Sequence, residues 1–136
     1  MSEIKVDTIS ESTGSNGIRL GHAIVEKQNA VSVTSNTLGI DASDGGLYTV
    51  TVDANISTFN ITNMVSGQAI TVIFTNDGTG GYTVTTSISV NGASASAIKT
   101  AGGAGWTMTT TASAIDIVTF VWDGTNLYAV AQQAWS

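Results

Sequence analysis

Residue types that perform catalysis or hold metals are scarce in this sequence. It has one histidine, His22, and no cysteine among 136 residues. A general base or an activated nucleophile needs a partner side chain within hydrogen-bond reach. No cysteine, second histidine or cluster of carboxylates accompanies His22. We therefore expect no catalytic residue and no metal site, and we interpret His22 as a structural or solvated residue.

Two aspartate- and glycine-containing stretches resemble ligand-binding loops only in part. Residues 41–46 (DASDGG) lack the alternating oxygen ligands and the closing glutamate of a calcium loop. Residues 76–81 (NDGTGG) are rich in glycine, but a phosphate loop requires a following helix, and Tyr82 begins a strand-like run. We interpret residues 41–46 as a turn with local side-chain hydrogen bonds and residues 76–81 as a hairpin loop. No cofactor is expected.

Exposed aromatic rings are a further candidate for chemistry, because they can stack on sugars, although aromatic rings also fill cores. Trp122 lies in the most apolar run of the sequence, which favours a place in the core. Trp106 and Trp135 have more polar neighbours in the sequence. These two tryptophans are our candidates for contact with a glycan or a partner protein.

The element that organises the chain is a predicted β-hairpin near the carboxyl end. Two runs of β-branched and aromatic residues, 115–122 and 126–134, flank the turn-forming residues Asp123 and Gly124. Alternate residues of run 115–122 are largely apolar on both faces. We therefore expect this strand to be central and covered on both sides, and to pair with residues 69–74, which are also apolar on both faces.

Short strand-like runs separated by glycine-containing turns continue through the chain from residue 29. Their even spacing predicts an all-β fold, an antiparallel β-sandwich of jelly-roll type, with little or no helix. Residues 91–105, rich in glycine and alanine, are expected to be irregular. The expected strands are 29–34, 37–41, 47–53, 56–62, 68–76, 81–90, 94–99, 105–110, 115–122 and 126–134.

Charge and hydropathy exclude several classes of partner. Charged residues make up 10% of the chain, against about 25% in ordinary soluble domains. Residues 29–136 hold one lysine and six aspartates, a net charge of −5. Phosphate backbones repel such a surface, so a nucleic-acid partner is not expected. No apolar run is long enough to span a bilayer, so no membrane partner is expected either.

Residues 1–28 differ from the body formed by residues 29–136. Two short alternating runs, 4–9 and 18–25, flank a polar stretch, and neither run could form a stable strand alone in water. We interpret this segment as an amino-terminal arm that becomes ordered by pairing with another chain; an unpaired terminus is the alternative. The residues expected to make the docking contacts are Ile4, Val6, Ile9, Ile18 and Leu20.

The arm and the body carry a resemblance to a known group of proteins. Residues 3–10 (EIKVDTIS), with the Ser/Thr/Gly/Asn run after them, resemble the opening of many virion structural proteins, notably tail fibres, of tailed phages that infect cyanobacteria and other marine bacteria. The body is similar to a small β domain of such fibres and appendages. That similarity covers residues 55–63 (NISTFNITN), 67–74 (GQAITVIF), 76–82 (NDGTGGY) and 120–128 (FVWDGTNLY).

The resemblance implies a non-enzymatic structural role in the virion, with other virion proteins as partners and a homotrimer as the assembly. Because the arm leads almost directly into the β body, a short appendage, a capsid decoration or an adaptor is implied rather than a long fibre. The alternative function is a carbohydrate-binding module for a host surface glycan. A depolymerising enzyme is disfavoured, because its paired carboxylates in a groove have no counterpart among the scattered aspartates.

Overall fold

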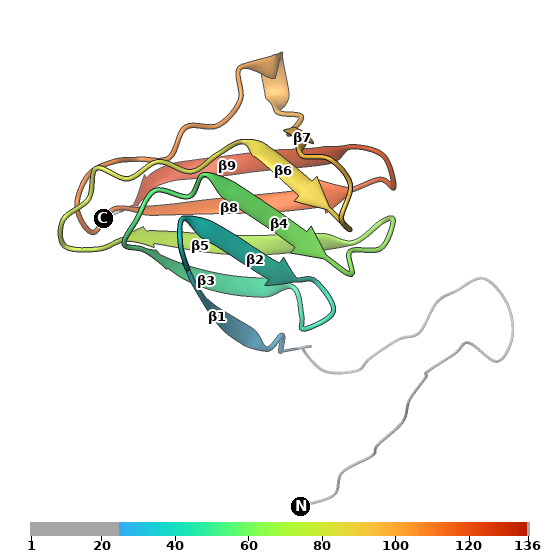
Figure 1. Ribbon diagram of the computed structural model, residues 1–136, viewed down its shortest axis with the longest axis horizontal. Coiled ribbons are helices and arrows are strands. Elements are labelled where there is room, and N and C mark those ends of the chain that lie inside the picture. Colours follow the sequence, from blue (N-terminus) through green and yellow to red (C-terminus); the bar gives the residue numbers. More distant parts are fainter. Residues whose placement is uncertain (1–24, 136) are drawn as a thin grey trace, which may run out of the picture.

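The computed structural model describes residues 25–135, and the regular secondary structure of this part of the chain is almost entirely β-strand (Figure 1). The arm residues Ile4, Val6, Ile9, Ile18 and Leu20, together with His22, lie outside the described residues. The elements are β1 (Gln28–Ser32), β2 (Thr37–Asp41), β3 (Leu47–Val52), β4 (Thr58–Thr62), β5 (Ala69–Asn76), β6 (Ser87–Val90), β7 (Ser96–Ala97), the 3-10 helix η1 (Ala101–Gly103), β8 (Ile115–Trp122) and β9 (Leu127–Trp135).

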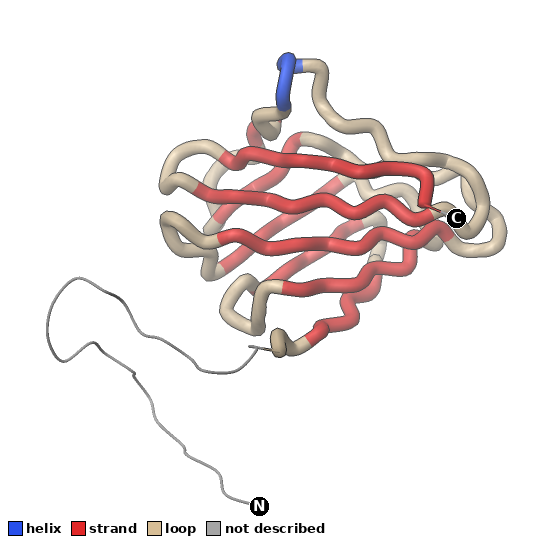
Figure 2. Tube along the Cα trace, turned by 180° about the vertical axis from the view of Figure 1, so that it is seen from behind, coloured by secondary structure: helices blue, strands red, loops and turns tan. Residues whose placement is uncertain are grey.

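The strands form two sheets that share one core. The larger sheet has five strands in the order β1-β3-β5-β8-β9, and the smaller has four in the order β2-β4-β6-β7. Figure 1 looks onto the smaller sheet, and Figure 2 onto the larger sheet from behind. Buried apolar residues of both sheets belong to a single cluster. The all-β, two-sheet part of the prediction is therefore confirmed.

Consecutive strands from β1 to β6 lie alternately in the two sheets. The pairs β1–β3 and β3–β5 in the larger sheet and β2–β4 and β4–β6 in the smaller one are all parallel. The chain therefore winds three times through both sheets, with one strand in each sheet per turn. Among the strand pairs of the described residues, β5–β8, β8–β9 and β6–β7 are antiparallel, and an isolated antiparallel bridge joins Thr34 to Thr37.

The prediction of an antiparallel, jelly-roll-like arrangement is thus wrong for the first six strands. Short strands separated by turns look alike in sequence whether the chain returns beside the previous strand or crosses to the opposite sheet. The windings also differ in length. Leu47 pairs with Gln28, 19 residues earlier, and with Thr71, 24 residues later. Because the number of residues per winding is not constant, the sequence contains no regular repeat from which the winding could be recognised.

The predicted pairing around β8 is confirmed. β8 and β9 form an antiparallel hairpin, and β8 pairs with β5 along residues 69–75. One face of β8, formed by Asp116, Val118 and Phe120, is buried. The other is covered only in part, and Val121 on that side is 40% exposed. Both faces of β8 were expected to be covered, and within the described chain only the face toward the core is.

Residues 105–110 do not form the predicted strand, although Trp106 and Met108 point into the core as alternate strand residues would. Two buried side chains hold this segment instead. The Asn76 amide donates to the carbonyl oxygens of Thr109 (2.6 Å) and Thr111 (2.9 Å), and the Asp116 carboxylate accepts from the Thr109 N–H (2.8 Å). Side-chain hydrogen bonds therefore replace the backbone pairs of a sheet.

The other departures are shorter. Only residues 87–90 of the predicted strand 81–90 are a strand, and Ile56 and Val84 form an isolated bridge beside it. The segment 91–105 is mainly irregular, as expected, and contains the two-residue β7 and η1. The loop 76–81 is not a hairpin loop, because it joins β5 to β6 in the opposite sheet.

Three phenylalanines from both sheets meet at the centre of the core. Phe59 of β4 lies edge-on to Phe74 of β5, with ring centroids 6.3 Å apart, and to Phe120 of β8, at 5.8 Å. All three are essentially inaccessible to solvent. Edge-to-face contacts are favoured by the ring quadrupoles. Phe59 is therefore the main aromatic link between the two sheets.

We predict that Phe59→Ala lowers the free energy of unfolding by about 3–5 kcal/mol, because it removes a large ring from a closed core. The matched control is Thr58→Ala, on the exposed side of the same strand, for which a change within about 0.5 kcal/mol is expected. Urea unfolding of both variants measures the difference. Equal losses for the two variants would contradict this description of the core.

Candidate assembly surface

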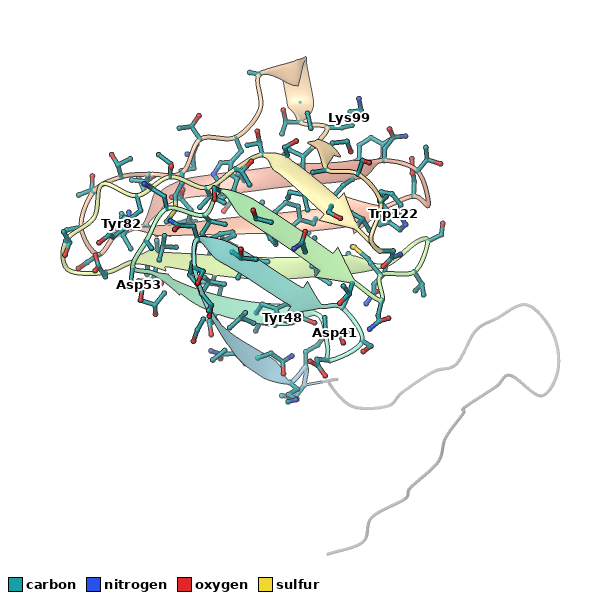
Figure 3. All side chains as sticks on the ribbon, viewed as in Figure 1. Asp41, Tyr48, Asp53, Tyr82, Lys99 and Trp122 are labelled. Carbon is teal, nitrogen blue, oxygen red and sulfur yellow. The ribbon has the colours of Figure 1, made fainter. Side chains whose placement is uncertain are left out.

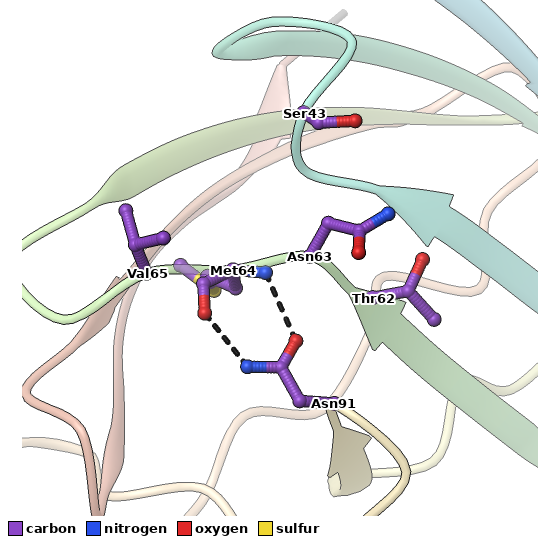
Figure 4. Close-up of a pocket in the computed structure, with 6 residues that line it drawn as sticks. All are labelled: Ser43, Thr62, Asn63, Met64, Val65 and Asn91. Carbon is purple, nitrogen blue, oxygen red and sulfur yellow. Dashed lines mark hydrogen bonds between the residues drawn. The ribbon is translucent and has the colours of Figure 1, made fainter.

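The loops that follow β2, β4 and β6 surround a surface hollow with a volume of about 810 Å³ (Figure 4). Its polar side chains already serve the loops themselves. The Asn91 amide forms two hydrogen bonds with the backbone of Met64, one accepted from its N–H (2.9 Å) and one donated to its carbonyl (2.7 Å). Asn91 thus replaces a strand partner at the end of β4. The side chains that line this hollow thus stabilise the turns around it.

The stretch 41–46 is a turn, as predicted. Asp41 accepts hydrogen bonds from the backbone N–H (3.0 Å) and the hydroxyl (2.7 Å) of Ser43 and from the amide of Asn63 (2.9 Å). The bond from Asn63 is the main reason that the pKa of Asp41 is lowered. Residues 25–135 contain no group of three or more histidine or acidic residues that could hold a metal ion.

Tyr48 fastens the same turn to the core (Figure 3). Its ring is 1% exposed, and its hydroxyl lies 2.5 Å from the carbonyl oxygen of Asp41 and 2.8 Å from that of Gly45. Burial is the main reason that the pKa of Tyr48 is raised. Tyr48 is therefore a structural residue.

The loop 76–81 is organised in the same way. Asp77 accepts from the backbone N–H groups of Thr79 (2.8 Å) and Gly80 (3.0 Å), and these bonds lower its pKa. Gly80 has a positive φ of 68°, and a Cβ there would meet the carbonyl oxygen of Thr110 at 2.6 Å. The glycine allows two backbone segments to approach closely. This packing explains the glycine at this position without a bound phosphate.

The two candidate tryptophans occupy very different places. Trp106 is 5% exposed and its ring packs on Phe74, with centroids 5.2 Å apart. Its ring is thus not available for stacking in this structure. Trp135 is 50% exposed and borders a pocket of about 320 Å³ that is also lined by Thr109, Thr111 and Ser113. The glycan contact remains a prediction, and among these two tryptophans it depends on Trp135.

The edge of the larger sheet at β9 is covered over a short length. The Lys99 N–H donates to the carbonyl of Leu127, and the Lys99 carbonyl accepts from the N–H of Ala129, both at 2.8 Å. At Thr100 the chain leaves the strand direction and enters η1. A cleft of about 450 Å³ lies between residues 100–107 and residues 129–133. Past Ala129 the edge of β9 is therefore only partly protected against pairing with another chain.

The most extensive unusual surface is the outer face of the five-stranded sheet, which consists of the alternate strand residues that point away from the core. Two rows of paired residues cross it from β1 to β9. One row is Ala30, Thr49, Ile73, Ile117 and Gln132, and the other is Gln28, Leu47, Thr71, Thr119 and Val130. No described segment crosses this face in Figure 2.

This outer face carries no charge. The only charged residue in its five strands is Asp116, which is buried in the core. Three large apolar side chains are exposed near the β8–β9 turn: Val121 (40%), Tyr128 (44%) and Val130 (67%). Parallel strands are usually covered on both faces of their sheet. The face therefore has the composition of a surface that packs against protein.

The outer face of the smaller sheet is different. Its outward positions are mainly threonine, serine, asparagine and glycine, for example Thr37, Gly39, Asn60 and Ser89. It contains no exposed large apolar side chain. Only one of the two sheet faces is thus suited to packing. The sequence signal for that face was the apolar alternation on both sides of residues 69–74 and 115–122.

Comparisons with protein-family models, with curated proteins and with solved structures found no match to this chain. Within residues 25–135 there is no helix long and apolar enough to cross a membrane.

The turn between β8 and β9 matches its predicted chemistry and contains the carboxylate with the most strongly lowered pKa. Asp123 accepts from the backbone N–H groups of Asn126 (2.6 Å) and Thr125 (2.7 Å). These two bonds lower its pKa from 3.8 to about 2. The Tyr128 hydroxyl also donates to Asp123 (3.1 Å), and this bond raises the pKa of the tyrosine.

A group whose pKa is lower in the folded state stabilises the fold above its unfolded pKa, and the stabilisation is lost as the pH falls through the folded value. We predict that Asp123→Asn is less stable than the parent chain at neutral pH. This difference should shrink as the pH falls from 3.8 to about 2, because only the parent chain titrates at this position. Thermal unfolding of both proteins across this range tests the prediction. A difference that is constant with pH would contradict it.

Proposed function

We propose that this protein is a non-enzymatic structural component of a tailed-phage virion. In this proposal it is a short trimeric fibre, appendage, capsid decoration or adaptor, with other virion proteins as its partners and the virion as its location. The observation that carries the proposal is the uncharged outer face of the five-stranded sheet, with Val121, Tyr128 and Val130 exposed on it. Exposed apolar patches often mark sites of interaction with other proteins, which is why this face supports an assembly role.

The described polar groups support the same proposal. Asp41, Asp77, Asn91 and Asp123 make hydrogen bonds within their own loops. Asn76 and Asp116 fasten an irregular segment to the core. These side chains are engaged in holding backbone, so they support a structural role better than a catalytic one. The resemblance of residues 3–10 and of the body to virion proteins supplies the virion part of the proposal.

The arm, residues 1–28, is proposed to anchor the protein to the particle. The described chain begins at Val25, immediately before β1 at one edge of the larger sheet. The described residues of the body, from residue 29 onward, contain a continuous core. In this proposal the arm binds a partner instead of adding to that core.

We predict that deletion of residues 2–20 leaves the circular dichroism spectrum and unfolding midpoint of the body unchanged, because the core lies within residues 38–129. The same deletion should abolish incorporation of the protein into phage particles, measured by immunoblotting of purified virions. A matched control is the exchange of the polar residues 12–16 for glycine and serine. A truncated protein that loads normally would refute the anchoring role.

A second candidate function is recognition of a host surface glycan. The pocket beside Trp135 supports it, because a half-exposed indole next to the hydroxyl groups of Thr109, Thr111 and Ser113 combines a stacking surface with hydrogen-bond donors and acceptors. The pocket is small, and no charged side chain lines it. A neutral sugar would suit it better than an acidic one.

If the glycan function is correct, the purified protein should bind at least one neutral glycan on an array. Trp135→Ala should abolish this binding, because it removes the stacking surface. Val130→Ala is the control, since Val130 is exposed on the same strand but does not line the pocket. An array without binding, or binding that is unaffected by Trp135→Ala, would count against this function.

A further inference from the structure

The middle of the outer face of the five-stranded sheet is its most apolar part. β5 is the central strand, and its residues Ala69 and Ile73 pair with Val121 and Ile117 of β8. The two paired threonines between them, Thr71 and Thr119, bond to each other through their hydroxyl groups at 3.0 Å. This hydrogen bond pairs the hydroxyl donor of one threonine with the hydroxyl oxygen of the other, which lowers the cost of dehydrating the central strip.

The size of this face is of the same order as one side of a stable interface. Five strands about 4.8 Å apart, each with several residues of about 3.3 Å, form a patch of roughly 500 Å² before the relief of the side chains is counted. A standard interface buries about 800 Å² on each partner. The face as a whole is therefore of the required order, and half of it would not be.

The width of the face also fits a particular symmetry. From β1 to β9 the sheet spans four strand spacings, or about 19 Å. Three such sheets arranged as the sides of a triangle lie about 5.5 Å from the common axis, which is close to half of the ~10 Å separation of packed sheets. Side chains of ordinary size would fill the interior without a channel.

We propose that the outer faces of the five-stranded sheets of three copies pack around a threefold axis, with Ile73 and Ile117 near the axis. This inference rests on the trimer of the proposed function and assigns its interface. The absence of charged residues from the outward positions of the five strands favours another copy of the same face as the occupant, because copies of a chain of net charge −6 repel each other least where they carry no charge. The polar face of the smaller sheet is left outside.

The absence of cysteine from the chain allows a direct test by thiol cross-linking. Ile73→Cys, treated with a short bis-maleimide, should give a denatured band at twice the mass of the chain, because its thiols meet near the axis. Asn60→Cys, on the outer face of the smaller sheet, is the matched control and should remain at the mass of one chain. Labelling of Ile73→Cys without cross-linking would overturn the inference.

A second variant separates the interface from the fold. Adding Ile117→Lys to Ile73→Cys should abolish the cross-linked band, since it places a charge beside the axis, whereas adding Asn60→Lys should not. Circular dichroism confirms that both doubly substituted chains are folded. If the Ile117→Lys variant is unfolded, Val130→Lys is used in its place, because Val130 is 67% exposed. This substitution should also abolish the cross-linked band. Cross-linking that persists in a folded lysine variant would overturn the inference.

These outcomes are distinguishable from those that test the proposed function. Failure of the cross-linking tests, together with loading that depends on the arm, would remove the threefold interface and leave the virion role in place. Normal cross-linking, together with normal loading of the arm deletion, would support the interface and remove the anchoring role.

Discussion

The structure depends on one constraint, which is that strands of both sheets turn alternate side chains into a single shared core. Because β1 to β6 alternate between the sheets, each turn of the chain contributes inward residues from both sides. Phe59 lies at the centre and contacts Phe74 and Phe120 across the core. The outward residues of the same strands are freed from any role in folding, and their composition then determines what the surface can do.

Hydrogen bonds from a few side chains take over where the chain leaves the sheets. Asn91 pairs with the backbone of Met64, Asp123 holds the N–H groups of its own turn, and Asn76 and Asp116 hold the segment around Thr109. Such bonds satisfy backbone groups without ion pairs. They explain how a chain with 10% charged residues can form well-defined loops without proline or disulfides.

Local features of the sequence predicted much of this structure, but they did not predict how the chain winds between the two sheets. The β8–β9 hairpin, its pairing with β5 and the turns at Asp41 and Asp123 follow from alternation and turn chemistry, which are local. The parallel winding could not be predicted, because the choice between returning in one sheet and crossing to the other depends on a core that is assembled from distant residues. The burial of Trp106 could not be predicted for the same reason. Its neighbours in the sequence are small and polar, but in the fold its ring packs on Phe74. The outer face was foreseen only as a second apolar side of residues 69–74 and 115–122.

The buried core and the uncharged outer face are the two features on which the proposed assembly role rests. The described residues form one continuous core, whereas the outer face of the larger sheet combines uncharged polar side chains with the exposed Val121, Tyr128 and Val130. The most direct test is the mass of the unmodified full chain in solution, measured by multi-angle light scattering at micromolar concentration. The account predicts a mass three times the 13.9 kDa of one chain. A stable monomer at that concentration would contradict it.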